Sequence, residues 1–270
     1  MRMLRPVMLI SILFIHNPAF AQRPDHVVVV VEENKSFNDI IGNQDALYIN
    51  QLASQGALMM ESYAIMHPSL PNYIALFSGS THGIKDDGCN YDLKGENLAQ
   101  SLHEAGFSFK TFSETMPNSG FTQCGYSAYR KKHNPLAYFD ALPGDLNQPF
   151  RDFPGDFARL PTIAFVIPNM DHDMHDGTVA QADGWLRKNI APYVVWAESH
   201  NSLLVLTWDE DDDTDLNHIV TIFIGAHVKP GKYIQHIDHY DVLRTLAMFY
   251  GVRPPNNAAK SKPVTGIWAQ

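Results

Sequence analysis

Uninterrupted apolar blocks, each followed by polar residues, proline or glycine, recur along the chain. The block at residues 26–31 is almost entirely valine, and such a β-branched run is typical of a strand buried on both faces of a parallel sheet. Later blocks are followed by Pro168, Trp208-Asp209 and Gly225. The pattern therefore predicts strands at residues 26–31, 162–167, 202–207 and 219–224.

Segments with helical spacing lie between or after these strands. The predicted helices are 96–104, 179–199 with a break near Pro192, and 239–250 between Asp238 and Gly251. Strands that alternate with helices predict an α/β fold, here a three-layer sandwich around a central and mostly parallel sheet. Ligands of such sheets collect beyond the carboxyl ends of the strands, so polar residues that follow strands are the first candidates for a site.

The first residues have the order of a signal peptide. Arg2 and Arg5 precede an apolar stretch at 7–15, and small alanines flank Phe20. This pattern predicts cleavage after Ala21, and with it a signal peptide at 1–21, a single domain at 22–270 and a secreted or periplasmic protein. The apolar stretch is shorter than the ~20 residues of a spanning helix, so no stable membrane insertion is expected.

The composition changes this picture in two respects. Of 270 residues, 29 are acidic and 20 are Lys or Arg, which leaves a net charge of −9. Nucleic-acid binding requires a basic face and is not expected. Cys89 and Cys124 would meet an oxidising compartment after export, which favours a disulfide over two buried thiols. That bridge would close a long loop and stabilise the fold by roughly 3–4 kcal/mol.

Ser69 stands in His67-Pro68-Ser69-Leu70-Pro71-Asn72, directly before an apolar helical run. Serine is a common N-cap and proline suits the first helical turn, so this stretch alone favours a helix cap. A serine there also faces free backbone N–H groups at the positive end of a helix, and that place binds phosphate. Both interpretations, a cap and a residue that acts on phosphate, remain open.

Two clusters of acidic residues and histidines follow predicted strands. Five of the six residues at 171–176 are Asp or His, and Asp171 and His175 could reach one ion if that segment were helical. Residues 209–213 are five consecutive carboxylates, which repel one another unless a cation neutralises them. We therefore predict a metal site at the first cluster, and Asp209 with Glu210 as the better ligand candidates of the second.

Glu33 and Asn34 follow the first predicted strand, and His218 precedes the fourth. Taken alone, each of these is more often a structural polar residue than a ligand. Because the ends of neighbouring strands share one edge of the sheet, these residues are also candidates for the predicted metal site.

Together and in this order, these segments resemble the acid phosphatase and phospholipase C branch of the alkaline-phosphatase superfamily, over about residues 26–251. Glu33-Asn34-Lys35-Ser36-Phe37 after an apolar strand is similar to the start of that branch. Ser69-Leu70-Pro71-Asn72 is similar to the Thr-x-Pro-Asn nucleophile segment of the related nucleotide phosphodiesterases. The resemblance implies an alkaline-phosphatase-like fold, metal-dependent hydrolysis of phosphate esters, and Ser69 as the nucleophile.

The resemblance also implies ligands for one or two divalent metal ions. One ion would be held by Asp171, His175 and His218. The other would be held by Glu33, Ser69, Asp209 and Glu210, with Asn34 beside them. Glu210 stands where the metal-rich phosphatases carry His, which favours oxygen ligands, and Zn, Mg, Mn, Ca and Fe all stay candidates.

The implied reaction is attack of Ser69 on phosphorus to form a phosphoserine. The Asn72 amide and the helix N-terminus would stabilise the phosphoryl oxygens. His67, His172 and Asp173 are candidates for substrate binding.

The compact chain favours a small-molecule phosphomonoester as substrate. The alternative enzyme is a phosphodiesterase or phospholipase C acting on phospholipid or nucleotide diesters, and the non-catalytic alternative is a periplasmic binder of phosphate or metal. A serine esterase is not supported, because the chain lacks a Gly-x-Ser-x-Gly elbow. The sequence predicts no oligomeric state.

Overall fold

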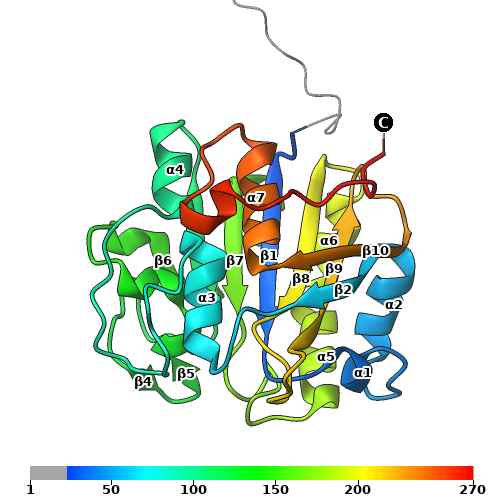
Figure 1. Cartoon of the computed structure of the whole chain (residues 1–270), viewed down its shortest axis with the longest axis horizontal. Coiled ribbons are helices and arrows are strands. Elements are labelled where there is room, and N and C mark those ends of the chain that lie inside the picture. The colour runs from blue at the N-terminus through cyan, green and yellow to red at the C-terminus, as the bar shows by residue number, and fades with distance from the viewer. Residues whose placement is uncertain (1–22, 270) are drawn as a thin grey trace, which may run out of the picture.

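The computed structural model describes residues 23–269, so the predicted signal peptide at 1–21 lies outside the described residues. An eight-stranded sheet in the order β10-β2-β9-β8-β1-β7-β3-β6 forms the middle of the molecule (Figure 1). Its strands are β1 (His26–Glu32), β2 (Ala57–Tyr63), β3 (Phe109–Ser113), β6 (Asn147–Pro149), β7 (Ile163–Ile167), β8 (Ser202–Trp208), β9 (His218–Gly225) and β10 (Gly231–Asp238). A small antiparallel pair consists of β4 (Gly125–Tyr126) and β5 (Tyr129–Arg130).

Helices cover both faces of the sheet, as Figure 1 shows. They are α1 (Phe37–Ile40), α2 (Leu47–Gln55), α3 (Ser69–Ser78), α4 (Leu98–Glu104), α5 (Val179–Asn189), α6 (Ala191–Ala197) and α7 (His239–Phe249). Short 3₁₀ helices in the loops are η1 (Lys131–His133), η2 (Pro135–Tyr138), η3 (Gly144–Leu146), η4 (Phe150–Asp152), η5 (Phe157–Arg159) and η6 (Asn256–Ala259).

Alternate valines of β1 belong to two separate hydrophobic cores. Val27 and Val29 pack into the core that α3, α4 and α7 cover, whereas Val28 and Val30 pack into the core that α1, α2, α5 and α6 cover. All four are fully buried, and burying a valine side chain contributes about 1.5–3 kcal/mol. The helix–sheet–helix arrangement confirms the predicted three-layer sandwich.

The sheet is mostly parallel, as predicted. Within the described residues, every strand pairing of this sheet is parallel except the two that β9 makes, with β8 and with β2. Because β9 runs in the opposite direction, its first residue, His218, lies at the edge where β1, β7 and β8 end. Residues that follow three strands and a residue that opens a fourth therefore share one edge of the sheet.

All four predicted strands are present, but β2, β3, β6 and β10 were not predicted. Strand β2 contains Met59, Met60 and Glu61 rather than a β-branched run, and several residues of β10 are exposed at the end of the sheet. The break predicted near Pro192 is confirmed, because α5 ends at Asn189 and α6 begins at Ala191.

The predicted disulfide between Cys89 and Cys124 is confirmed, with 5.4 Å between the two Cα atoms. It joins the loop after α3 to the segment that precedes β4. None of the helices in residues 23–269 combines the length and the apolar character that crossing a membrane requires.

Candidate active site

Ser69 is the first residue of α3 and is only 1% exposed. The interpretation of Ser69 as the N-cap is wrong, since Pro68 occupies that position and the Ser69 hydroxyl makes no capping hydrogen bond. The hydroxyl of Ser69 is therefore not used by its own helix. At the other end of α3, Gly79 adopts a φ of 71°, and a Cβ there would lie 2.2 Å from the carbonyl oxygen of Pro255.

The Ser69 hydroxyl points at two carboxylates. It lies 3.0 Å from Glu33 Oε2 and 3.1 Å from Glu210 Oε1 as a donor. A hydroxyl carries a single proton, so it can donate fully to only one of these oxygens at a time. The serine is thus held in place by groups that can also accept its proton.

The two neighbouring strands β1 and β8 bring the acidic residues together. Glu32 of β1 is paired with Trp208 of β8, and the backbone N–H of Asp209 donates to the carbonyl of Glu32. Glu33 and Asp209 consequently lie side by side at the same edge of the sheet. The sequence predicted this neighbourhood, because both residues directly follow parallel strands.

Asn34 ties these two strand ends to each other. Its backbone N–H donates to Asp209 Oδ1 at 3.3 Å, and its Nδ2 donates to Glu210 Oε1 at 3.2 Å. Its φ of 47° lies in the left-handed region, which asparagine tolerates better than most residues. The structure therefore brings Glu33, Asn34, Ser69, Asp209 and Glu210 into one hydrogen-bonded group, as the resemblance implied.

Burial sets the electrostatics of this group. It raises the pKa of Glu33 and Asp209 well above the ordinary range, and the negative charges of Asp209 beside Glu33 and of Glu210 beside Asp209 raise them further. Burial also raises the pKa of Glu210, although His67 opposes the shift. A bound cation would supply the charge that keeps such carboxylates ionised.

The donor atoms of this group fit a cation. Glu33 Oε1, Asn34 Oδ1 and Asp209 Oδ2 are buried and have no hydrogen-bond partner. Buried polar atoms normally have one, and oxygen atoms of carboxylates and amides are ligands of hard divalent ions. These three unpartnered oxygens are the structural observation that favours a metal site.

A second buried cluster adjoins the first through Glu33. His133 Nε2 lies 3.1 Å from Glu33 Oε1, and His133 Nδ1 lies 3.1 Å from Asp173 Oδ2. Neither contact is aligned as a hydrogen bond, since His133 Nε2, Glu33 Oε1 and Asp173 Oδ2 all lack a partner. Ligand atoms of these three side chains lie within 4.8 Å of one another, a spacing at which they could hold one metal ion.

The charge state of His133 makes this cluster unusual. Burial and the neighbouring Lys132 hold the pKa of His133 well below its ordinary value, whereas burial raises the pKa of Asp173 to about 7. A neutral imidazole offers one N–H and one lone pair. Its lone-pair side therefore faces a carboxylate oxygen without a proton between them, unless that carboxyl is protonated or a cation binds there.

The predicted cation site of Asp171, His175 and His218 is not assembled. Residues 171–177 form turns rather than a helix, with Met174 at a φ of 80°, so Asp171 stays exposed. His218 Nε2 lies 3.0 Å from the carbonyl of Met60, and its ring stacks between Phe37 and Tyr63. Of this loop, Asp173 is the carboxylate that reaches the buried cluster.

His175 takes a different place. Its Nδ1 lies 2.8 Å from Asp176 Oδ1, and its Nε2 lies 3.2 Å from the Lys132 ammonium. The rings of His175 and His133 are 5.9 Å apart. His175 thus borders the site without joining Asp171 or His218.

Asn72 does not face the phosphate-binding side of α3, contrary to its predicted catalytic role. Its Oδ1 accepts from the backbone N–H groups of Ile65 and Met66 at 3.0 and 3.1 Å. Its Nδ2 donates to the carbonyls of Met66 and Pro68 at 2.6 and 3.2 Å. All the hydrogen-bonding capacity of the amide is used by the backbone, so Asn72 holds the turn that presents Ser69.

The two histidines predicted for substrate binding lie in different places relative to Ser69. His67 Nδ1 lies 2.6 Å from Glu210 Oε2, and its Nε2 donates to the carbonyl of Thr214, so it borders the site. His172 Nδ1 lies 2.9 Å from Glu114 Oε2, and the same carboxylate accepts from the indole of Trp185. His172 therefore belongs to the contact between the β7 loop and α5.

Three residues of the site were missed by sequence reasoning, namely His133, Lys132 and Asp87. Lys132 Nζ donates to Asp87 Oδ2 at 2.8 Å, and Asp87 Oδ1 accepts from the backbone N–H of Leu70, next to Ser69. Lys132 and His133 lie in η1, which follows no strand of the central sheet. No local pattern around them indicated a site.

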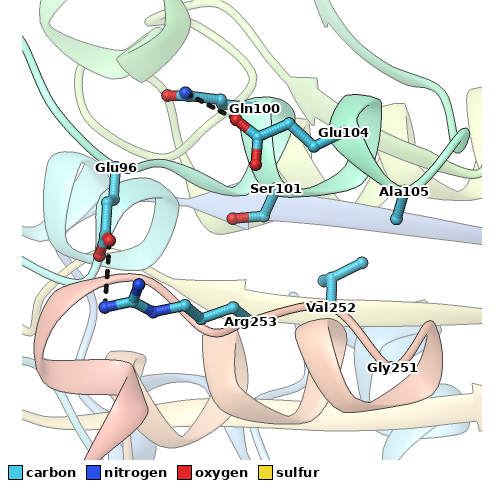
Figure 2. A pocket seen from close by; sticks show the side chains of 8 residues that line it. All are labelled: Glu96, Gln100, Ser101, Glu104, Ala105, Gly251, Val252 and Arg253. Carbon is cyan, nitrogen blue, oxygen red and sulfur yellow. Dashed lines mark hydrogen bonds and ion pairs between the residues drawn. The ribbon is translucent and has the colours of Figure 1, made fainter.

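A cavity elsewhere on the molecule has no comparable chemistry. A pocket of about 350 Å³ lies between α4 and the segment after α7 (Figure 2). Two of its carboxylates interact with other lining residues, Glu96 with Arg253 at 3.2 Å and Glu104 with Gln100 at 2.9 Å. Figure 1 places α4 at the end of the sheet opposite the start of α3, so this pocket is separate from Ser69.

Comparison with known proteins shows the family to which the chain belongs. A sequence model of the Phosphoesterase family matches residues 43–253. A phosphatidylinositol-3-phosphatase of Mycobacterium tuberculosis is 47% identical over 254 residues, which cover 93% of this chain and 84% of the mycobacterial protein. An acid phosphatase of Aspergillus fumigatus is 30% identical over 241 residues, 82% of this chain and 53% of the fungal protein. The chain thus spans about half the length of that fungal relative.

Solved structures with the same fold are more distant in sequence. A protein in the alkaline phosphatase superfamily from Vibrio parahaemolyticus gives a TM-score of 0.60 at 14% identity, over 91% of this chain and 71% of that chain. A phosphonate monoester hydrolase from Silicibacter pomeroyi gives 0.60 at 11% identity, over 89% and 76%. These similarities confirm the alkaline-phosphatase-like architecture.

Proposed function

The chain belongs to the Phosphoesterase family and is a hydrolase of phosphoric esters, and from that premise we propose that it hydrolyses phosphomonoesters through a phosphoserine on Ser69. The observation that carries the proposal is the buried Ser69 hydroxyl, which is free of its helix and lies between the carboxylates of Glu33 and Glu210. A serine needs an adjacent proton acceptor to become a nucleophile, and this one has two.

The proposed reaction has two steps. Ser69 Oγ attacks phosphorus, and the serine proton passes to Glu33 or Glu210. The bond from phosphorus to the ester oxygen breaks, and that oxygen takes up a proton and leaves as the alcohol. Water then attacks the phosphoserine and gives one proton to the carboxylates, the bond from phosphorus to Ser69 Oγ breaks, and inorganic phosphate leaves. The carboxylates return a proton to Ser69 Oγ in this second step.

We also propose that a divalent cation is required. Glu33, Asn34, Asp209 and Glu210 would hold it beside Ser69, and the cluster of Glu33, His133 and Asp173 offers a further place for a cation. When bound, the cation supplies positive charge that lowers the pKa of the serine hydroxyl. The predominance of oxygen donors favours hard ions such as Mg, Mn and Ca, while His133 would also suit Zn or Fe.

A phosphoinositide is a second candidate substrate, within the same chemistry. It is supported by the 47% identity to a protein named phosphatidylinositol-3-phosphatase. The phosphate at the inositol 3-position of that lipid is a monoester, so the proposed reaction applies to it without change. The relatives named acid phosphatase support small phosphomonoesters instead.

The test compares p-nitrophenyl phosphate, bis(p-nitrophenyl) phosphate and phosphatidylinositol 3-phosphate, before and after chelation. We expect both monoesters to be cleaved, the diester to be cleaved poorly, and activity to fall on chelation and return with a divalent ion. Faster cleavage of the diester would establish a phosphodiesterase instead. Phosphate binding without cleavage of any of the three would establish a binding protein.

Export remains a proposal of its own. It is supported by the sequence pattern at residues 1–21 and by the Cys89–Cys124 bridge, because disulfides persist in oxidising compartments. Mass spectrometry of the protein from its native host should show a chain that begins at Gln22. An intact first residue on a cytoplasmic product would contradict export.

A further inference from the structure

Lys132 brings a positive charge to a site built from carboxylates. Its side chain is only 15% exposed, and Nζ donates to Asp87 Oδ2 at 2.8 Å. Glu33 and Asp209 interact electrostatically with this ammonium. A lysine side chain is positively charged at neutral pH, so Lys132 is a cation within electrostatic reach of the carboxylates around Ser69.

Asp87 connects this ammonium to the nucleophile. Its Oδ2 accepts from Lys132, and its Oδ1 accepts from the backbone N–H of Leu70 at 3.0 Å. Leu70 directly follows Ser69. One carboxylate thus fixes Lys132 relative to the turn that presents the serine hydroxyl.

His175 accepts a second hydrogen bond from the Lys132 ammonium. An ammonium can only donate, so His175 Nε2, 3.2 Å away, accepts with its lone pair. The ring proton of His175 is then on Nδ1, which faces Asp176 Oδ1 at 2.8 Å. Two N–H groups of Lys132 are used in this way, and the third has no acceptor among residues 23–269.

Lys132 does not act as a direct partner of the proposed metal ligands. In the described part of the chain, no lysine or arginine forms an ion pair with Glu33, Asp209 or Glu210. The neighbouring Lys131 points elsewhere, with its Nζ 3.2 Å from the carbonyl of Cys89 and 4.4 Å from the ring centre of Tyr138. Of these two neighbouring lysines in η1, Lys132 is therefore the one whose ammonium lies beside Asp87 and His175.

From this geometry we propose that Lys132 binds the phosphoryl group of the substrate, with Asp87 and His175 holding its ammonium in place. A phosphomonoester dianion approaches a site that already contains several carboxylates, so it needs a positive charge that those carboxylates do not neutralise. A lysine ammonium is a suitable point charge for phosphate, and the third N–H is the donor it offers. The inference rests on the proposed phosphomonoesterase function.

The test measures binding of inorganic phosphate to the metal-loaded Ser69→Ala protein by calorimetry. Adding Lys132→Gln should weaken binding about tenfold or more, because a hydrogen bond to a charged group contributes about 1.5–3 kcal/mol. Lys132→Arg should restore most of the affinity. Lys94→Gln is the matched control, since it removes the same charge from a side chain that is 83% exposed, and it should leave binding unchanged.

Two further readouts separate phosphate binding from a structural role. Metal content and the unfolding midpoint of Lys132→Gln should equal those of its parent, and Lys132→Met replaces it if the glutamine variant does not fold. In the Ser69 background, Lys132→Gln should raise KM and weaken inhibition by phosphate in parallel.

The outcomes also separate this inference from the proposed function. A loss of less than tenfold in phosphate affinity, or an equal loss in Lys94→Gln, would overturn the role of Lys132 even if the wild-type chain cleaves phosphomonoesters. Absence of cleavage by the wild-type chain would overturn the proposed function, while the phosphate titrations would still report on Lys132.

Discussion

The hydroxyl of Ser69 lies 3.0 Å from Glu33 Oε2, although 36 positions separate the two residues along the chain. Glu33 follows β1, and Ser69 opens α3 after the chain has passed through α1, α2 and β2. The contact exists because the end of β1 and the start of α3 meet at one edge of the sheet. The Ser69 hydroxyl therefore bonds to an acid that follows a distant strand and takes no part in capping its own helix.

The first prediction concerns Ser69→Ala. Turnover of a chromogenic phosphomonoester should fall by several orders of magnitude, as is usual when a nucleophile is removed. The free energy of unfolding should fall by no more than about 1–3 kcal/mol, the cost of leaving the buried Glu33 Oε2 without its donor, so the protein should stay folded. Acid quenching of the wild-type reaction followed by peptide mapping should place the phosphate on Ser69. Phosphate on Ser78, at the other end of α3, would contradict the assignment.

The second prediction separates Asn72 from catalysis. Asn72→Ala should leave the backbone N–H groups of Ile65 and Met66 without acceptors, and each such buried group costs about 1–3 kcal/mol. Urea unfolding should therefore show a loss of at least about 2 kcal/mol. Asn118→Ala, at an exposed asparagine, is the control and should change stability by less than about 0.5 kcal/mol. Lost turnover at unchanged stability would restore the direct catalytic role that the sequence suggested.

The third prediction concerns cation removal. Dialysis against a chelator should abolish turnover and lower the unfolding temperature, because a ligand that binds only the folded state stabilises it, by ~2.7 kcal/mol at 100 times its Kd. Asp209→Asn should reduce the metal bound per chain, measured by elemental analysis. His172→Gln is the control, since His172 pairs with Glu114, and it should keep the full metal content. Full activity after exhaustive chelation would exclude a required cation.

The fourth prediction concerns His133. His133→Asn should lower the metal affinity of the cluster of Glu33, His133 and Asp173 by at least about 10–100-fold, because losing a group that only orients a metal ligand has that effect and His133 would supply a ligand atom itself. The reason is that His133 is the neutral group placed between Glu33 and Asp173. Competition with a chromophoric chelator measures the affinity, and His103→Asn on the exposed side of α4 is the matched control. Wild-type affinity in His133→Asn would show that Glu33 needs no support from the imidazole.

Sequence patterns predicted the elements in which several local signals agree. Strand β1 is a run of valines, and α7 begins after Asp238, whose side chain accepts from the backbone N–H groups of Tyr240 and Asp241. The same patterns failed for β2 and β10, whose pairing depends on neighbouring strands rather than on a β-branched run of their own. The acidic group of Glu33, Asp209 and Glu210 was predictable, because residues that follow parallel strands must meet at one edge.

The sequence by itself determined the fold class, the segment that carries Ser69 and the acids that follow β1 and β8, because strand periodicity and the residue after a strand are local properties. Only the tertiary structure decided that Asp173 rather than Asp171, and His133 rather than His218, join the buried cluster. The turns at 171–177 bury one aspartate and expose another two positions away. Composition does not specify such a backbone path, and it also does not specify that η1 carries Lys132 and His133 to the site.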